Sequence, residues 1–155
     1  MDKDIMKDIQ NNVDFNLKKM DIIKVGYYGL ALVLLILPMF QVNVSIFGTS
    51  GSVANGFQTI FNGNAFIFGL LYLIAMCGGA ATLFVKPIMT FEKIAFVFAP
   101  IACLVILFLV NSSVSSTYFG IVQPAFGFWL IVLLHLAAIG YQWYPTIMKI
   151  LNEKK

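Results

Sequence analysis

The chain has 155 residues, of which 60% are hydrophobic and only 11% are charged. A soluble domain of this length carries about a quarter charged residues on its surface, so the composition disfavours that class and indicates a membrane protein. All ten basic residues are lysines, set against seven acidic residues and one histidine. Because proteins that read nucleic acids depend on arginine for paired hydrogen bonds to guanine and phosphate, we expect no nucleic-acid partner.

Residues 1–24 form the first polar segment. Apolar residues recur in it at intervals of three and four, which places them on one face of a helix: Ile5, Ile9, Val13, Leu17 and Met20. The pattern predicts a cytoplasmic amphipathic helix that lies on the inner leaflet or against a partner. The alternative is a loosely ordered tail, since the Asp and Asn residues of this segment are weak helix formers.

Four apolar runs without Asp, Glu, Lys or Arg follow, at residues 25–42, 65–85, 94–110 and 119–143. Each approaches or exceeds the length of about 20 residues that a helix needs to cross the hydrocarbon core. Pro100 lies in the third run and predicts a kink there. The sequence therefore predicts an all-α integral membrane protein, an antiparallel four-helix transmembrane bundle over residues 25–144, with a cytoplasmic tail at 145–155.

The lysines indicate how this bundle is oriented. They lie before the first run, in the turn at 86–93, or in the tail at 149–155, whereas the loops at 43–64 and 111–118 carry no charge. Basic residues collect on the cytoplasmic side of membrane proteins. We therefore expect a multi-pass protein of the plasma or inner membrane with both termini in the cytoplasm, a pattern typical of small bacterial four-pass proteins.

The first external loop combines two periodicities. Polar and apolar residues alternate over 41–46, which suits a short strand, and the turn residues 48–51 follow. We then expect a short amphipathic helix that Ser52 caps. This helix would lie at the outer interface or between the spans, where it meets a partner or serves as a lid, with one apolar face formed by Val53, Phe57, Ile60 and Phe61.

Small residues in the second run indicate close helix packing. Ala75 and Gly79 are four residues apart, a spacing that lets two helix backbones approach each other in lipid. The approach could be within one bundle or between copies, and the sequence leaves both alternatives open.

One set of side chains at equal depth could bind a metal. Cys77, Cys103 and His135 each lie nine or ten residues from the cytoplasmic edge of their runs, and Met76 adds a further soft ligand. Such a set could hold Zn²⁺ or Cu(I) if the side chains faced a common point. The alternative is a neutral His135 that is hydrogen-bonded to a neighbouring helix, with cysteines that act as apolar filler.

No motif for catalysis, for a cofactor or for nucleotide binding stands out, and we expect neither enzymatic activity nor a cofactor. The leading hypothesis is a non-enzymatic interaction protein, an accessory or immunity-type subunit whose partners are the lipid bilayer and another membrane protein. The alternative is a small homo-oligomeric channel or transporter, because uncharged polar residues gather at the outer rim. A single four-helix bundle has no room for an aqueous path, so a pore would require several copies.

Overall fold

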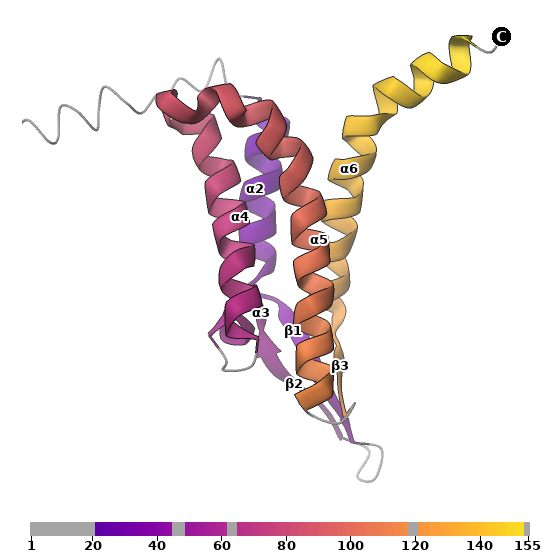
Figure 1. Ribbon diagram of the computed structural model, residues 1–155. Helices are drawn as coiled ribbons and strands as arrows, with labels where there is room; N and C mark the ends of the chain where they lie inside the picture. The colour runs from indigo at the N-terminus through magenta and orange to yellow at the C-terminus, as the bar shows by residue number, and fades with distance from the viewer. Residues whose placement is uncertain (1–20, 45–48, 62–64, 118–120, 154–155) are drawn as a thin grey trace, which may run out of the picture.

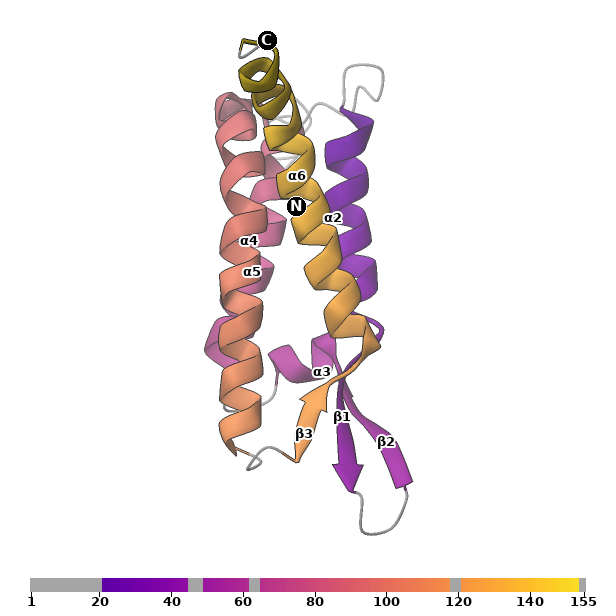
Figure 2. The ribbon, with the colours of Figure 1, turned by 90° about the vertical axis from the view of Figure 1, so that its right-hand side faces the viewer.

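The computed structural model describes residues 21–44, 49–61, 65–117 and 121–153 (Figure 1). Most of the predicted N-terminal amphipathic helix lies outside these residues. In chain order the elements are α2 (Ile22–Leu34), β1 (Pro38–Val44), β2 (Thr49–Asn55), α3 (Gly56–Ile60), α4 (Phe66–Phe84), the 3₁₀ helix η1 (Lys86–Phe91), α5 (Glu92–Thr117), β3 (Val122–Pro124) and α6 (Phe126–Glu153). Helices α2, α4, α5 and α6 lie lengthwise side by side, and the strands project from one end (Figures 1 and 2).

The prediction of a mostly helical chain with helices long and apolar enough to span a membrane is confirmed. Within the described residues there are three such segments, namely Phe66–Phe84, Lys86–Ser116 and Phe126–Ile150. Helix α2 is apolar but has only 13 residues. The first predicted span, 25–42, divides between α2 and β1, because Pro38 disfavours helical geometry in the residue before it and cannot continue a helix.

A three-stranded antiparallel sheet, which an all-α class does not include, lies at one end of the helices. Its strand order is β2-β1-β3, so β1 is the central strand. The strand that the alternating pattern predicted is present in the described part of the loop, and it begins earlier, at Pro38. Met39 and Phe40 are almost fully buried, which shows that the start of β1 belongs to the core.

The short helix of the first loop begins later than the sequence suggested. Asn55, and not Ser52, caps α3: its side chain accepts a hydrogen bond from the Gln58 backbone, and the Gln58 side chain accepts one from the Asn55 backbone. Both residues therefore satisfy donors at the helix start that would otherwise have no partner. Val53 consequently lies in β2 and not on the helix.

Backbone hydrogen bonds fasten the sheet to the helices. The Gly56 amide donates to the Leu35 carbonyl at 2.8 Å, and the Ala125 amide donates to the Met39 carbonyl at 2.9 Å. Gly127, at the start of α6, lies so close to β1 that a β-carbon there would be 2.5 Å from the Pro38 carbonyl oxygen. This close approach requires glycine, and it brings α6 directly onto the beginning of β1.

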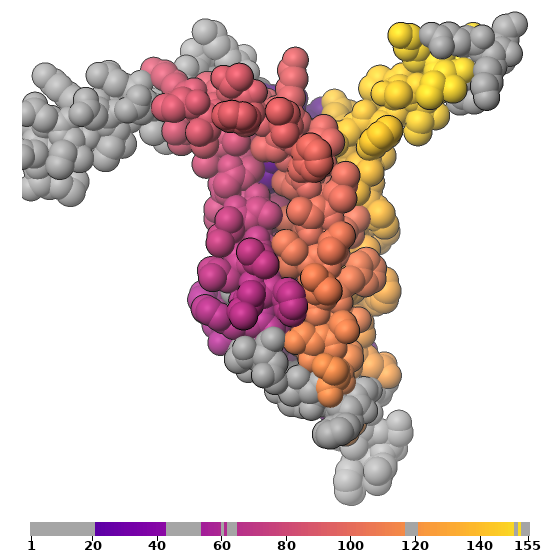
Figure 3. Space-filling model, in the orientation of Figure 1, coloured from indigo at the N-terminus to yellow at the C-terminus, as the bar shows by residue number. Residues whose placement is uncertain are grey.

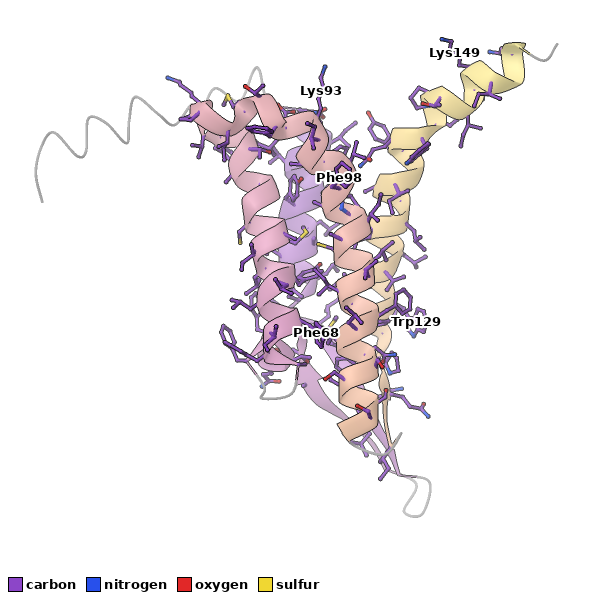
Figure 4. All side chains as sticks on the ribbon, in the orientation of Figure 1. Phe68, Lys93, Phe98, Trp129 and Lys149 are labelled. Carbon is purple, nitrogen blue, oxygen red and sulfur yellow. The ribbon has the colours of Figure 1, made fainter. Side chains whose placement is uncertain are left out.

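At the opposite end, an ion pair joins α2 to α5. The Lys24 Nζ atom lies 2.6 Å from Glu92 Oε1 and 3.3 Å from Asp21 Oδ2. Asp21 also caps α2 by accepting a hydrogen bond from the Ile23 amide. Lys93 and Lys149 lie at this end as well (Figure 4), which is called the lysine-bearing end below.

The proline inside α5 is compensated by a side chain of α6. Pro100 has no N–H, so the carbonyl of Phe96, four residues earlier, has no partner within its own helix. The Gln142 Nε2 atom donates a hydrogen bond to this carbonyl at 2.5 Å. The amide of Gln142 therefore replaces the donor that proline removes and links α5 to α6.

We predict that Gln142→Leu destabilises the protein by roughly 1–3 kcal/mol, because it leaves the Phe96 carbonyl, in a partly buried position, without a hydrogen bond. In a Pro100→Ala background the same change costs clearly less, because the alanine restores a backbone donor within the helix. Unfolding titrations in denaturing detergent, arranged as a double-mutant cycle, measure the difference. An equal loss in both backgrounds would contradict the compensation.

Candidate functional site

A polar centre lies inside the helical region, formed by Tyr27 of α2, Tyr72 of α4 and His135 of α6. His135 is fully buried, and both tyrosines are at most 5% exposed. The Tyr27 hydroxyl lies 2.7 Å from His135 Nδ1, and the Tyr72 hydroxyl lies 3.0 Å from His135 Nε2. Both ring nitrogens therefore have hydrogen-bond partners, each from a different helix.

The geometry favours one tautomer of the histidine. A neutral imidazole has one donor nitrogen and one acceptor nitrogen. If Nδ1 carries the proton, it donates to Tyr27, the Tyr27 hydroxyl donates to the Met76 sulfur at 3.9 Å, and Tyr72 donates to Nε2. With the proton on Nε2, the Tyr72 hydroxyl must accept and its own proton has no acceptor in the part of the chain that the structure describes. We therefore assign the proton to Nδ1.

This tyrosine–histidine centre is closed. The hydrogen bonds saturate the imidazole, and the rings of Tyr27 and Tyr72 pack edge-on against it at centroid distances of 5.6 and 5.8 Å. The arrangement matches the hydrogen-bonded alternative for His135. It links α2 and α4 to α6 in the way that polar side chains join helices in lipid.

The three proposed metal ligands are not brought together. Cys103 and His135 are fully buried, whereas Cys77 is exposed on the outer surface of α4. Adjacent residues on a helix point about 100° apart, and Met76, the neighbour of Cys77, takes the inward position. Within the described residues, no group of three His, Cys, Asp or Glu side chains could hold a metal ion.

Sequence reasoning missed the two tyrosines. Each lies in an apolar run, and a hydroxyl buried in such a run needs a hydrogen-bond partner. That requirement is the signal that could have connected Tyr27 and Tyr72 with His135.

A groove runs between α4 and α5 in the half of the molecule nearer the lysine-bearing end. Figure 3 shows this hollow, with α2 behind it. Its volume is about 300 Å³. The lining residues are mostly small, and we call the set the small-residue groove: Ala75, Gly78 and Gly79 of α4, and Ala95, Ala99 and Ala102 of α5, bordered by Ile74 and Phe98.

The two glycines of this groove have different roles. A β-carbon on Gly79 would lie 2.6 Å from the Tyr28 hydroxyl, so Gly79 admits the ring of a buried tyrosine. A β-carbon on Gly78 would meet nothing within 4 Å. Of the alternatives left open by the sequence, Gly79 serves packing inside the protein. Ala75 is partly buried against the core, and Gly78 is exposed on the outer face.

A second apolar groove lies between α2 and α6, with a volume of about 230 Å³. Three of its nine lining residues are small, namely Gly26, Ala137 and Ala138, and the others are larger, among them Leu30, Leu134 and Tyr141. In the small-residue groove, six of the eight lining residues are small. The small-residue groove is therefore the better candidate for helix packing.

The apolar residues predicted for the loop helix are divided between two elements. Val53 lies in β2, and Ile60 is the last residue of α3, but the side chains of both lie outside the described part. Phe57 and Phe61 are 37% and 68% exposed. Two exposed phenylalanines therefore remain near the sheet.

We predict that His135→Phe destabilises the protein by roughly 1–3 kcal/mol, because it keeps an aromatic ring but leaves two buried hydroxyls without their partner. Adding Tyr27→Phe and Tyr72→Phe removes those hydroxyls and recovers part of the loss. Detergent unfolding of the single and triple variants tests this. If the triple variant is less stable than His135→Phe, the centre is not the closed network described above.

Comparison with known proteins gives no match. No protein-family model matches the chain, and neither a curated protein nor a solved structure is significantly similar to it.

Proposed function

We propose that this chain is a non-enzymatic four-pass membrane protein that binds a transmembrane helix of another membrane protein in its small-residue groove. It would act as an accessory or immunity-type subunit in the plasma or inner membrane. Helix α2, together with the start of β1, would make the fourth crossing, and the lysine-bearing end would face the cytoplasm.

Two contacts support the fourth crossing. The ion pair between Lys24 and Glu92 holds the start of α2 beside the start of α5. The hydrogen bond from Ala125 to Met39 holds the chain beyond α2 beside the start of α6. Residues 24–39 therefore connect the level at which α5 starts with the level at which α6 starts, although only part of that distance is helical.

The groove is the observation that carries the proposal. In lipid no hydrophobic force drives helices together, and close contact between backbones at small residues supplies the attraction instead. Only helices and closed barrels cross the hydrocarbon core, so a protein occupant of a groove at this depth is a helix. Of the six small residues on its two walls, Gly78 and Ala102 are exposed, Ala75 and Ala95 are partly buried, and Gly79 and Ala99 are buried. The exposed and partly buried ones offer a helix a surface without large side chains.

The interior supports a role without conduction through a single chain. Among the residues that the structure describes, the hydrogen-bond partners of His135 are Tyr27 and Tyr72, and neither is a carboxylate or a lysine. Tyr72, Phe128 and Ile131 are among the side chains that fill the space between the helices. A water path would therefore have to form between several copies, which is the channel alternative.

Gly78→Leu tests the proposal. A β-carbon added at Gly78 meets no atom within 4 Å, so we expect leucine to fit there and to occupy the groove. Gly140→Leu is the matched control, because Gly140 on α6 also faces open space and does not line the groove. The readout is the mass and composition of the complex extracted from native membranes into nanodiscs.

We expect the wild-type protein and Gly140→Leu to retain a stoichiometric partner, and Gly78→Leu to lose it by about tenfold or more, because the added side chain prevents close backbone approach. Retention of the partner by Gly78→Leu would refute the groove as its site. Rings of identical chains with no partner would instead favour the channel alternative.

A further inference from the structure

We propose that the last part of α6, residues 144–153, lies on the bilayer surface as an amphipathic segment and binds anionic phospholipids. We call this segment the α6 arm. Its contact with lipid is separate from the small-residue groove and depends only on α6 being a membrane-spanning helix.

Helix α6 is longer than one membrane crossing requires. It has 28 residues, Phe126–Glu153, whereas about 20 residues cross the hydrocarbon core. A crossing of that length, counted from Phe126, ends at Pro145. Trp143 and Tyr144 are exposed at this level, and such aromatic side chains collect at the headgroups of a bilayer. The α6 arm therefore begins at the bilayer surface.

The α6 arm has one apolar and one polar face. Successive residues of a helix are about 100° apart, which separates its apolar residues from its polar ones. The apolar face holds Tyr144, Ile147, Met148 and Ile150, and the polar face holds Thr146, Lys149 and Asn152. Tyr144 and Ile147 are 62% and 51% exposed, so the described part of the chain leaves much of the apolar face open.

Pro145 bends the arm toward its apolar face. The proline ring clashes with the carbonyl of Tyr141, four residues earlier, so the helix opens on the proline side and bends away from it. At 100° per residue, Pro145 lies on the same side of the helix as Lys149 and Asn152. Figure 1 shows the arm leaning away from the other helices. A helix that bends in this direction at the bilayer surface brings its apolar face down onto the lipid.

The charges of this region specify which lipid it binds. Residues 145–155 contain three lysines and one glutamate, a net side-chain charge of +2. Figure 4 shows Lys149 pointing away from the sheet end, as Lys93 does. Anionic headgroups attract lysines at a membrane surface, and each lysine strengthens the contact about fivefold. An apolar face against the acyl chains with lysines among the headgroups is typical of helices that lie in the membrane interface.

Nitroxide labels on the full chain in nanodiscs test the position of the arm. Ile147→Cys places a label on the apolar face, and its neighbour Thr146→Cys places one on the polar face, both in a Cys77→Ala background. In nanodiscs of phosphatidylcholine and phosphatidylglycerol, we expect the label at 147 to be several-fold better shielded from a water-soluble nickel chelate than the label at 146, and to collide readily with lipid-soluble oxygen.

Two outcomes of this labelling would overturn the proposal. Equal exposure of both labels to the nickel chelate would mean that the arm extends into water. A label at 147 that neither oxygen nor the nickel chelate reaches would mean that protein, and not lipid, covers the apolar face.

The choice of anionic lipid is tested by the same label at 147. In nanodiscs of phosphatidylcholine alone, its shielding from the nickel chelate should fall several-fold. Lys149→Glu should cause a similar fall in the mixed nanodiscs, whereas Lys93→Glu, an exposed lysine at the same end but outside the arm, should not. Shielding that changes neither with phosphatidylglycerol nor with Lys149→Glu would refute binding to anionic phospholipids.

Discussion

The need of every buried backbone group for a hydrogen-bond partner governs this structure. A helix meets that need by itself, and irregular backbone at membrane depth meets it only through the rest of the protein. Here the carbonyls of Leu35 and Met39, which follow the end of α2, accept hydrogen bonds from Gly56 and Ala125. The loops thus return to the helices because the interrupted helix α2 requires donors there.

The same requirement extends to proline and to polar side chains. Pro100 deprives the Phe96 carbonyl of its donor, and α6 supplies one through Gln142. The imidazole of His135 is held by hydroxyls from two other helices. Each of these groups joins two or more helices by hydrogen bonds. The Tyr28 hydroxyl is an exception, because it is buried without a hydrogen-bond partner among the described residues.

The sequence predicted the long helices well because their signal is local. Uncharged runs alone locate α4, α5 and most of α6. Prediction from the sequence failed where contacts between distant residues determine the secondary structure. Pro38 ends helical geometry in the first apolar run, and the residues from Pro38 onward form a strand that pairs with β2 and β3. Helix α6 continues past Pro145 to Glu153, and Figure 1 shows its end leaning away from the other helices.

For the candidate sites too, local signals could be predicted from the sequence, whereas contacts between distant residues could not. Equal depth along the chain suggested a set of Cys77, Cys103 and His135, but depth carries no information about which face of a helix a residue occupies. Tyr27 and Tyr72 reach His135 because of how α2, α4 and α6 pack, and spacing in the sequence does not encode that. The place of Ala75 in the groove could be predicted, because small residues at a helical spacing indicate one face of the helix.

The central claim is that the chain crosses the bilayer four times, with the sheet and the lysine-bearing end on opposite sides. Labelling of introduced cysteines with a membrane-impermeant maleimide tests it most directly, in a background with Cys77→Ala, where the remaining Cys103 is fully buried and serves as the unlabelled control. The account predicts that Ile22→Cys, at the start of α2, reacts only from the cytoplasmic side, and that Ser112→Cys, near the sheet, reacts only from the opposite side. Reaction of both cysteines from the same side would contradict it.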